Sequence, residues 1–160
     1  MANMPSIKTR LILISVLSFL GIVVSGYSLK AHYNVGVATF CDINNTINCD
    51  AVNHSWASEI AGVPVALVGI IGYALILLGS LWLLFIKKIT NFTWGALALA
   101  SLGGLVFSLF LTGVEIFSLK TYCLLCITSQ LLMLAIAYLV WRTSVARQGL
   151  RSWFFSSSSS

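Results

Sequence analysis

The chain has 160 residues, of which 59% are hydrophobic and 8% are charged, whereas roughly a quarter of the residues in a soluble domain are charged. This composition predicts a membrane protein, and the length leaves room for one compact membrane unit without a second large domain. The formal net charge of +5 comes from basic residues that are not clustered, so the sequence predicts no nucleic-acid partner.

The first predicted span covers residues 11–29, an uncharged stretch that follows Lys8 and Arg10 and ends at Lys30. A secretory signal peptide is the competing interpretation, because a basic start, an apolar middle and small residues such as Gly26 resemble a cleavage site. The stretch is longer than a usual signal-peptide core, and further spans follow it. We therefore expect a retained transmembrane helix.

Residues 31–61 form a predicted loop in water. They hold three of the four acids, both histidines and the cysteines Cys41 and Cys49, and no apolar run long enough to span. Within this loop Asp50 can cap a short helix over residues 50–60, whose apolar side chains recur every four positions. We expect such a half-helix to lie at the membrane interface, with an irregular loop as the alternative.

Three more spans are predicted over residues 64–86, 91–118 and 121–141, and the only charged residue in them is an acid within 91–118. The many glycines and alanines in the second and third spans allow close helix packing in lipid. Residues 147–160 are basic and then serine-rich, which predicts a disordered tail. The predicted fold is an all-α membrane protein: a single domain over residues 1–146 that forms a bundle of four transmembrane helices.

The basic residues predict the orientation of this bundle. Seven of them fall on one side of a four-span topology: Lys8, Arg10, Lys87, Lys88, Arg142, Arg147 and Arg151. Only Lys30 and Lys120 fall on the other side. Because lysine and arginine concentrate in cytoplasmic segments, both termini are expected in the cytoplasm. All four cysteines then lie on the outer, oxidising side, as expected for disulfide-active thiols.

The fourth span opens with a Cys-x-x-Cys pair, Cys123 and Cys126. Cysteines three positions apart share one face of a helix. At the start of a helix, free N–H groups and the helix dipole favour thiolate over thiol, and Lys120 adds a positive charge nearby. A dithiol in this position is predicted to be reactive.

Two cysteine pairs allow three interpretations. Structural zinc sites use short spacing in both halves, but seven residues separate Cys41 from Cys49. Two structural disulfides are the second interpretation, although a disulfide within Cys-x-x-Cys closes a loop so small that it stabilises little. The favoured interpretation is thiol–disulfide exchange, in which electrons pass from one pair to the other without a metal.

The order of four features resembles the vitamin K epoxide reductase family. They are the loop pair Cys-x7-Cys, Ser55 six residues after Cys49, Gly-Val-Pro at residues 62–64, and Tyr-Cys-x-x-Cys-Ile-Thr at residues 122–128. The resemblance covers residues 11–141. DsbB-type quinone reductases also combine four spans with two cysteine pairs, but there the Cys-x-x-Cys pair comes first in the chain.

This resemblance implies a four-helix bundle around a quinone, either ubiquinone or menaquinone, beneath a cap that matches the predicted half-helix. Cys126 would be the thiol beside the quinone. Cys123 would be its partner and would exchange with Cys49. Cys41 would meet the substrate outside the membrane. The resemblance thus implies an order in which electrons pass between the pairs.

Three further residues are candidates for contact with the quinone: Ser55, Gln130 and Glu115. By resemblance, Ser55 would lie near the quinone under the cap. Gln130 stands where animal members have a tyrosine associated with vitamin K binding, which favours a prokaryotic quinone reductase. Glu115 is the one acid inside a predicted span, so it is a functional candidate for quinone protons or for pairing with Lys120. The alternative is a carboxylate that simply reaches the interface.

The function expected from these observations is that of a thiol–disulfide oxidoreductase in a bacterial inner (plasma) membrane. It would oxidise a partner protein and pass electrons through Cys41–Cys49 and Cys123–Cys126 to a membrane quinone. Some bacterial members carry a fused thioredoxin-like domain, for which 160 residues leave no room. The partner is therefore expected to be a separate thioredoxin-fold (DsbA-like) protein. The alternatives are a vitamin K epoxide or quinone reductase and a non-enzymatic membrane protein with structural disulfides.

Overall fold

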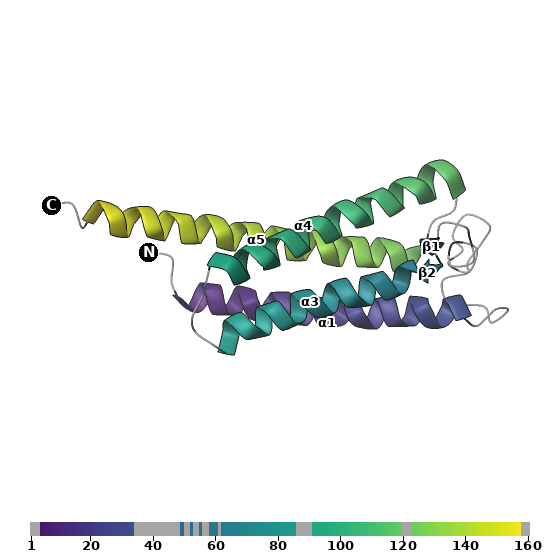
Figure 1. Ribbon diagram of the computed structural model, residues 1–160, viewed down its shortest axis with the longest axis horizontal. Coiled ribbons are helices and arrows are strands. Elements are labelled where there is room, and N and C mark those ends of the chain that lie inside the picture. The colour runs from purple at the N-terminus through teal and green to yellow at the C-terminus, as the bar shows by residue number, and fades with distance from the viewer. Residues whose placement is uncertain are drawn as a thin grey trace.

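Four long helices lie side by side in the computed structural model and build one elongated bundle (Figure 1). The structure describes residues 4–33, 49, 52, 55, 58–60, 62–85, 91–119 and 123–157. The helices are α1 (Met4–Tyr33), α3 (Val65–Phe85), α4 (Asn91–Val114) and α5 (Leu124–Ser157). Within the described residues the other elements are a π-helix, η2 (Glu115–Leu119), and two short strands, β1 (Glu59–Ile60) and β2 (Val63–Pro64).

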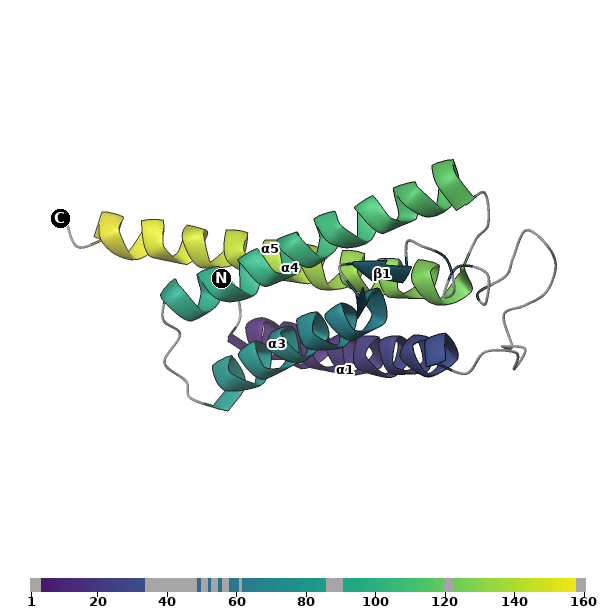
Figure 2. The ribbon, with the colours of Figure 1, turned by 45° about the vertical axis from the view of Figure 1, so that its right-hand side comes forward.

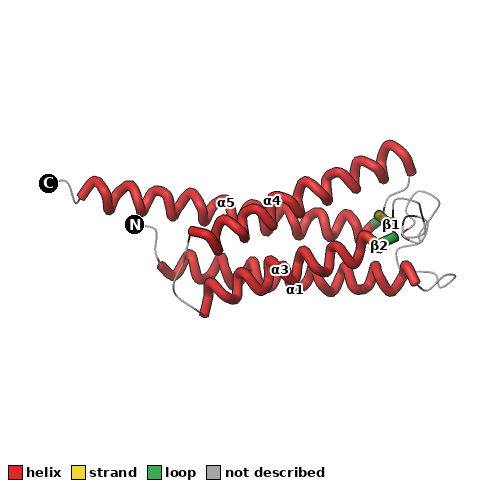
Figure 3. The backbone as a smooth tube through the Cα atoms, viewed as in Figure 1, coloured by secondary structure: helices red, strands yellow, loops and turns green. Residues whose placement is uncertain are grey.

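Each long helix contains a stretch that is long and apolar enough to cross a bilayer, with mean hydropathy between 2.0 and 2.3. These candidate spans are Ile7–Tyr33, Val65–Phe85, Phe92–Phe117 and Leu124–Val145. The prediction of an all-α membrane protein with four spans is confirmed. The tube drawing shows how fully helix dominates the described chain (Figure 3).

The outside of the bundle is apolar, and polar side chains lie within it. Large side chains such as Phe85 and Phe92 are exposed, which suits a surface solvated by lipid tails. Inside, the Ser15 and Ser80 hydroxyls, from α1 and α3, lie 2.8 Å apart. The Ser15 hydroxyl also contacts the carbonyl of Leu11, at 3.0 Å. Buried hydroxyls are tolerated here because each has a hydrogen-bond partner.

Two of the close contacts between helices occur at glycine residues, which have no side chain. A Cβ atom added to Gly21 of α1 would clash with the ring of Tyr73 of α3, and one added to Gly104 of α4 would lie 2.7 Å from Met133 Cε of α5. The Tyr73 ring can therefore lie flat across α1. Its hydroxyl donates to the carbonyl oxygen of Ser129 at 2.8 Å, so one tyrosine connects three helices.

One end of the bundle carries a small antiparallel hairpin, in which Glu59 pairs with Pro64 and Ile60 with Val63. We call this the hairpin end. Gly62 lies in the turn with φ of 77°, a conformation that glycine adopts without strain. α1 begins and α5 ends at the opposite end, which we call the terminal end; the views in Figures 1 and 2 agree on this arrangement.

The helix boundaries differ from the predicted spans at both ends of the bundle. α1 continues to Tyr33 instead of ending near residue 29, and α3 begins at Val65 because Pro64 belongs to β2. α5 begins at Leu124 and continues to Ser157, so residues 147–157, predicted as a disordered tail, are helical.

The predicted half-helix over residues 50–60 falls mostly outside the described residues, Asp50 included. Cys49 and Val52 have helical backbone, whereas Glu59 and Ile60 form β1 instead of continuing a helix. The strand forms because these two residues pair with the residues that follow the Gly62 turn. The half-helix prediction is therefore wrong for Glu59 and Ile60.

Candidate functional site

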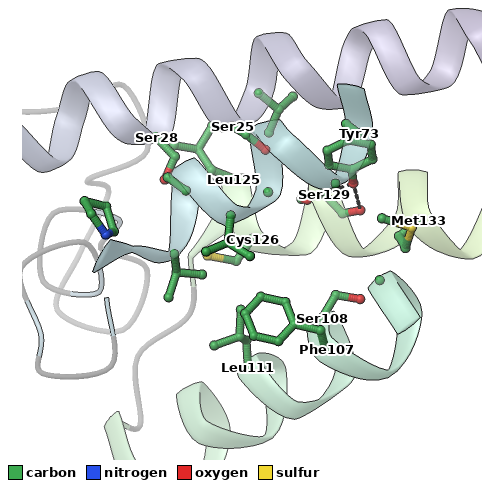
Figure 4. Close-up of a pocket in the computed structure, with 18 of the residues that line it drawn as sticks. Ser25, Ser28, Tyr73, Phe107, Ser108, Leu111, Leu125, Cys126, Ser129 and Met133 are labelled. Atoms are coloured by element: carbon green, nitrogen blue, oxygen red, sulfur yellow. Dashed lines mark hydrogen bonds between the residues drawn. The ribbon is translucent and has the colours of Figure 1, made fainter. Parts of the chain in front are cut away.

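A cavity of about 440 Å³ lies among the four helices toward the hairpin end (Figure 4). Most of its wall is apolar and includes Val68, Phe107, Leu111 and Met133. A smaller group of side chains gives it polar atoms: Ser25, Ser28, His32, Ser58, Tyr73, Ser108, Thr112, Glu115, Cys126 and Ser129. A cavity of this size, mostly apolar with a few polar groups, is typical of a small-molecule site.

The cavity reaches the lipid-facing surface between α3 and α4. Leu75 of α3 and Leu99 of α4 both line it, and they are 60% and 72% exposed. In a membrane, exposed leucine side chains on the outside of the bundle face lipid tails. An apolar molecule dissolved in the bilayer therefore has a lateral route to the cavity.

Cys126 lies in the first turn of α5 and forms part of the cavity wall (Figure 4). Its neighbour Cys123 directly precedes the helix, is fully buried and does not line the cavity. The two thiols are free. The helix start therefore presents one sulfur to the cavity and the other to the protein interior.

Cys123 occupies the N-cap position of α5. Its carbonyl accepts the first helical hydrogen bond, from the backbone N–H of Ile127 at 3.0 Å. Its sulfur accepts a second, from the backbone N–H of Cys126 at 3.4 Å. Serine or aspartate oxygen usually takes this place at a helix start. At the start of α5 the Cys123 sulfur takes this place, and N–H donors at a helix start stabilise a negative charge on it.

The pKa of the Cys123 thiol is lowered from its ordinary value, chiefly because the Cys126 thiol donates a hydrogen bond to its sulfur. Burial opposes this effect, and the backbone N–H groups of Cys126 and Leu125 support it. The direction is the one predicted for a thiol at a helix N-terminus. Cys123 is thus the more acidic position from which exchange can start.

Cys49 packs into the same buried cluster as Cys123, together with Val52 and Leu125. Both cysteines are fully buried. Cys49 is disulfide-bonded, in contrast to the free thiols of the Cys-x-x-Cys pair. Cys41 lies outside the described residues. The fold therefore brings one cysteine of the predicted loop pair to the start of α5.

Glu115 is the candidate that the structure places closest to the reactive sulfurs. It lines the cavity and is 5% exposed. Its carboxylate accepts hydrogen bonds from the Cys126 thiol and from the backbone of Cys123. The side chain is buried in the protein. Lys120, its other predicted partner, lies outside the described residues.

Ser55 and Gln130 lie near the cavity but are not among the described residues that form its wall. The Ser55 hydroxyl donates to the carbonyl of Val52 at 2.8 Å. Gln130 is buried, and its amide oxygen accepts a hydrogen bond from Thr112, a residue of the wall, at 3.4 Å. Any effect of Gln130 on a bound molecule would pass through Thr112.

Two residues that sequence reasoning missed also reach the cavity. Tyr73 lines it from α3 and hydrogen-bonds the Ser129 hydroxyl at 2.9 Å (Figure 4). His32 lines it from the last turn of α1, and its Nε2 lies 3.2 Å from Glu59 Oε1. A tyrosine in an otherwise apolar span was the available signal for the first. His32 was hidden because the predicted span ended at residue 29, four residues before the end of α1.

Among the described residues, no three histidine, cysteine or acidic side chains gather as a metal site requires. The composition of the cavity wall fits a quinone. A quinone has a flat apolar ring, two carbonyl oxygens and an apolar tail. The cavity offers apolar walls, hydroxyl donors such as Ser108 and Ser129, and the thiol of Cys126.

The sequence profile of the vitamin K epoxide reductase family matches residues 12–141, which contain all four cysteines. No curated protein gives a significant match. The matched range also covers most of each candidate span and the whole cavity wall. The chain therefore belongs to the vitamin K epoxide reductase family and is an integral membrane thiol–disulfide oxidoreductase linked to a quinone.

Proposed function

We propose that the protein oxidises the dithiol of a separate thioredoxin-fold (DsbA-like) partner and transfers the two electrons to ubiquinone or menaquinone. Electrons enter at Cys41–Cys49, pass to Cys123–Cys126 and leave from Cys126. The observation that carries this proposal is that the two neighbouring sulfurs, those of Cys123 and Cys126, have different surroundings. Cys126 lines the cavity, whereas Cys123 packs in one cluster with Cys49.

The first stage is thiol–disulfide exchange, which breaks one S–S bond for each one it forms. The partner's dithiol reduces the Cys41–Cys49 disulfide, and the Cys49 thiolate then attacks the sulfur of Cys123 in the oxidised inner pair. Cys126 leaves as a thiolate in this attack. Cys41 then attacks the sulfur of Cys49, and Cys123 leaves as a thiolate, which its lowered pKa favours. The products are an oxidised loop pair and a reduced inner pair.

The second stage returns the inner pair to its disulfide. The inner pair loses two electrons as its S–S bond forms, and the quinone takes up two electrons and two protons to become hydroquinone. The structure supports this stage because Cys49 is disulfide-bonded while the inner thiols are free. That combination is the state in which the inner pair is ready to donate electrons. Glu115, Ser55 and Gln130 are the proposed residues at or near the quinone.

We further propose that residues 1–146 work as a single domain in a bacterial inner (plasma) membrane. The hairpin end, with the cysteines, faces the periplasm, and both termini are cytoplasmic. Support comes from the seven basic residues that fall on the cytoplasmic side of this arrangement against two on the other. It also comes from the position of α1's start and α5's end at the terminal end of the bundle (Figure 1).

The test is an assay of the purified full chain with a short-chain ubiquinone and a reduced thioredoxin-fold protein. We expect quinone reduction that depends on the reduced partner. In Cys49→Ala, Cys41 should hold the partner as a mixed disulfide, whereas Cys123→Ala should not accumulate this species. Failure of Cys49→Ala to capture any thioredoxin-fold protein would remove the partner from the proposal. Turnover of vitamin K epoxide would support the alternative reductase.

A further inference from the structure

We propose that Glu115 is a catalytic residue of quinone reduction: its carboxylate takes the proton of Cys126 while that sulfur is oxidised, and passes it to the quinone. This inference rests on the proposed quinone reduction and assigns to one residue the transfer of a proton in it. It goes beyond contact with quinone, because it names the atom that gives the proton and the group that receives it.

The geometry brings three requirements together at one carboxylate. Glu115 contacts the thiol of Cys126 through a hydrogen bond. It also lines the cavity that would hold the quinone. At 5% exposure it is shielded from bulk water. A group that touches both the reacting sulfur and the substrate space can move a proton between them without a solvent intermediary.

The proton of Cys126 has two acceptors nearby. The thiol hydrogen-bonds both the sulfur of Cys123 and the carboxylate of Glu115, and a single S–H donates well to one of them at a time. While the inner pair is reduced, donation to Cys123 stabilises its thiolate. Once the Cys123 sulfur forms the S–S bond, Glu115 is the acceptor that remains.

The backbone supports a special role for this position. α4 ends at Val114, and the chain continues as the π-helix Glu115–Leu119. A π-helical turn is rare, because its wider turn gives poorer packing than an α-helix, and it occurs often at functional sites. Here the change of turn begins at Glu115, so the carboxylate follows a different helical register from that of α4.

Within the part of the chain that the structure describes, ion pairing does not explain this acid. The other described acid, Glu59, is 48% exposed and lies 3.2 Å from His32. Among the described residues Glu115 has no such cationic partner, and its hydrogen-bond partners are the Cys126 thiol and the backbone of Cys123. A buried carboxylate without a cation lowers stability. Retaining one beside a reactive thiol is expected where it handles protons.

The step balances as follows. Cys123 enters as a thiolate and Cys126 as a thiol, and their sulfurs form one S–S bond with the loss of two electrons and one proton. The quinone receives both electrons. One of its oxygens receives the Cys126 proton from Glu115, and the other oxygen receives a proton that originates in water. The products are the Cys123–Cys126 disulfide, a deprotonated Glu115 and hydroquinone.

The test compares Glu115→Gln with wild type in single-turnover oxidation of the pre-reduced full chain by a short-chain ubiquinone. Glutamine keeps the size of the side chain but cannot relay the proton. We expect the rate of disulfide formation at Cys123–Cys126 to fall about 10²-fold. The quinone KM and the rate of exchange with the loop pair should stay unchanged. Glu115→Asp should recover part of the rate.

Glu59→Gln is the matched control, because it removes an acid at the hairpin end that does not line the cavity. Its quinone reduction should equal that of wild type. The pH profile gives a second readout. The other ionisable side chains in the cavity wall are His32 of α1, Tyr73 of α3 and Cys126 of α5, and Cys123 lies behind it. Their contributions persist in Glu115→Gln, whereas the acid limb that requires a deprotonated Glu115 should disappear.

Two results would overturn the inference while leaving the proposed function intact. In the first, Glu115→Gln reduces quinone at the wild-type rate. In the second, the rate falls but the acid limb stays and Glu115→Asp recovers nothing, which would indicate a packing role. If the wild-type chain itself reduces no quinone, the proposed function fails, and the inference fails with it.

Discussion

The two ends of the bundle contain the same kinds of helix but are packed in opposite ways. A continuous apolar cluster extends from the cavity toward the terminal end and includes the fully buried Ile14 of α1 and Ile136 of α5. There Trp94 of α4 also donates to the Ser144 hydroxyl at 2.7 Å. Toward the hairpin end the helices enclose a cavity instead, and polar side chains enter its wall.

This difference indicates that the two ends of the bundle have different roles. Close packing at the terminal end holds the four helices at a definite spacing, because well-packed side chains leave little freedom for helices to move. That spacing keeps the cavity open at the hairpin end, where bound quinone and moving protons need room. Variants at one end should therefore change activity, and variants at the other should change stability.

Cys126→Ala should have the largest effect on activity. Loss of the sulfur in the cavity wall removes the donor of electrons, so quinone reduction should fall more than about 10³-fold. The melting temperature should change little, since the side chain is only slightly smaller. Spectroscopic assay of quinone reduction and thermal unfolding in detergent measure the two quantities. Turnover that survives this variant would contradict the proposed exit of electrons from Cys126.

Ile136→Ala should show the opposite pattern in the apolar cluster. Ile136 is fully buried in the apolar cluster, and truncating such a side chain costs about 2–5 kcal/mol of unfolding free energy. Turnover per folded molecule should remain near that of wild type. Leu134→Ala, at an exposed position of the same helix, is the control and should unfold like wild type. Equal losses in both variants would show that packing is uniform.

Gly103→Leu tests whether the cavity is the quinone site. Gly103 lines the cavity, and a Cβ added there meets no atom within 4 Å. The leucine should occupy quinone space and raise the quinone KM about tenfold, or about 1.4 kcal/mol of binding. Gly95→Leu is the matched variant, because it also meets open space on α4 but does not line the cavity. A similar KM in both variants would place the quinone elsewhere.

The smallest expected effect concerns the acidity of Cys123. Its pKa is lowered chiefly by the hydrogen bond from Cys126, so its thiolate persists to lower pH than that of an ordinary thiol. Cys126→Ser keeps a donor and Cys126→Ala removes it. Titration followed by thiolate absorbance should therefore give a lower midpoint in the serine variant. Identical midpoints in the two variants would show that the lowered pKa of Cys123 comes from the start of the helix alone.

Membrane topology was predictable because it follows from length and hydropathy. A helix must satisfy its own backbone hydrogen bonds in lipid and must cross a fixed thickness, so four uncharged runs of sufficient length predict four spans. Their boundaries were less predictable. α1 continues to Tyr33 and α3 begins only at Val65, because contacts such as that between His32 and Glu59 organise the chain beyond the apolar runs.

The candidate site was predictable in its residue types but not in its arrangement. The motif around Cys123 and Cys126 indicated a reactive dithiol, since a helix start favours thiolates wherever it occurs. It did not indicate which sulfur faces the cavity. Nor did the sequence show that Glu115, eight residues earlier, folds back against Cys126, because that contact depends on how η2 meets α5.

The amino-acid sequence by itself therefore determined that this protein folds in a membrane, the number of its spanning helices and the family to which its cysteine motifs belong. These properties depend on local composition and spacing. Only the tertiary structure decided that Cys126 lines a cavity, that Cys123 packs with Cys49, and that a buried acid lies beside them. Those contacts join segments far apart in the chain, and only the packing of whole helices sets the distances between such segments.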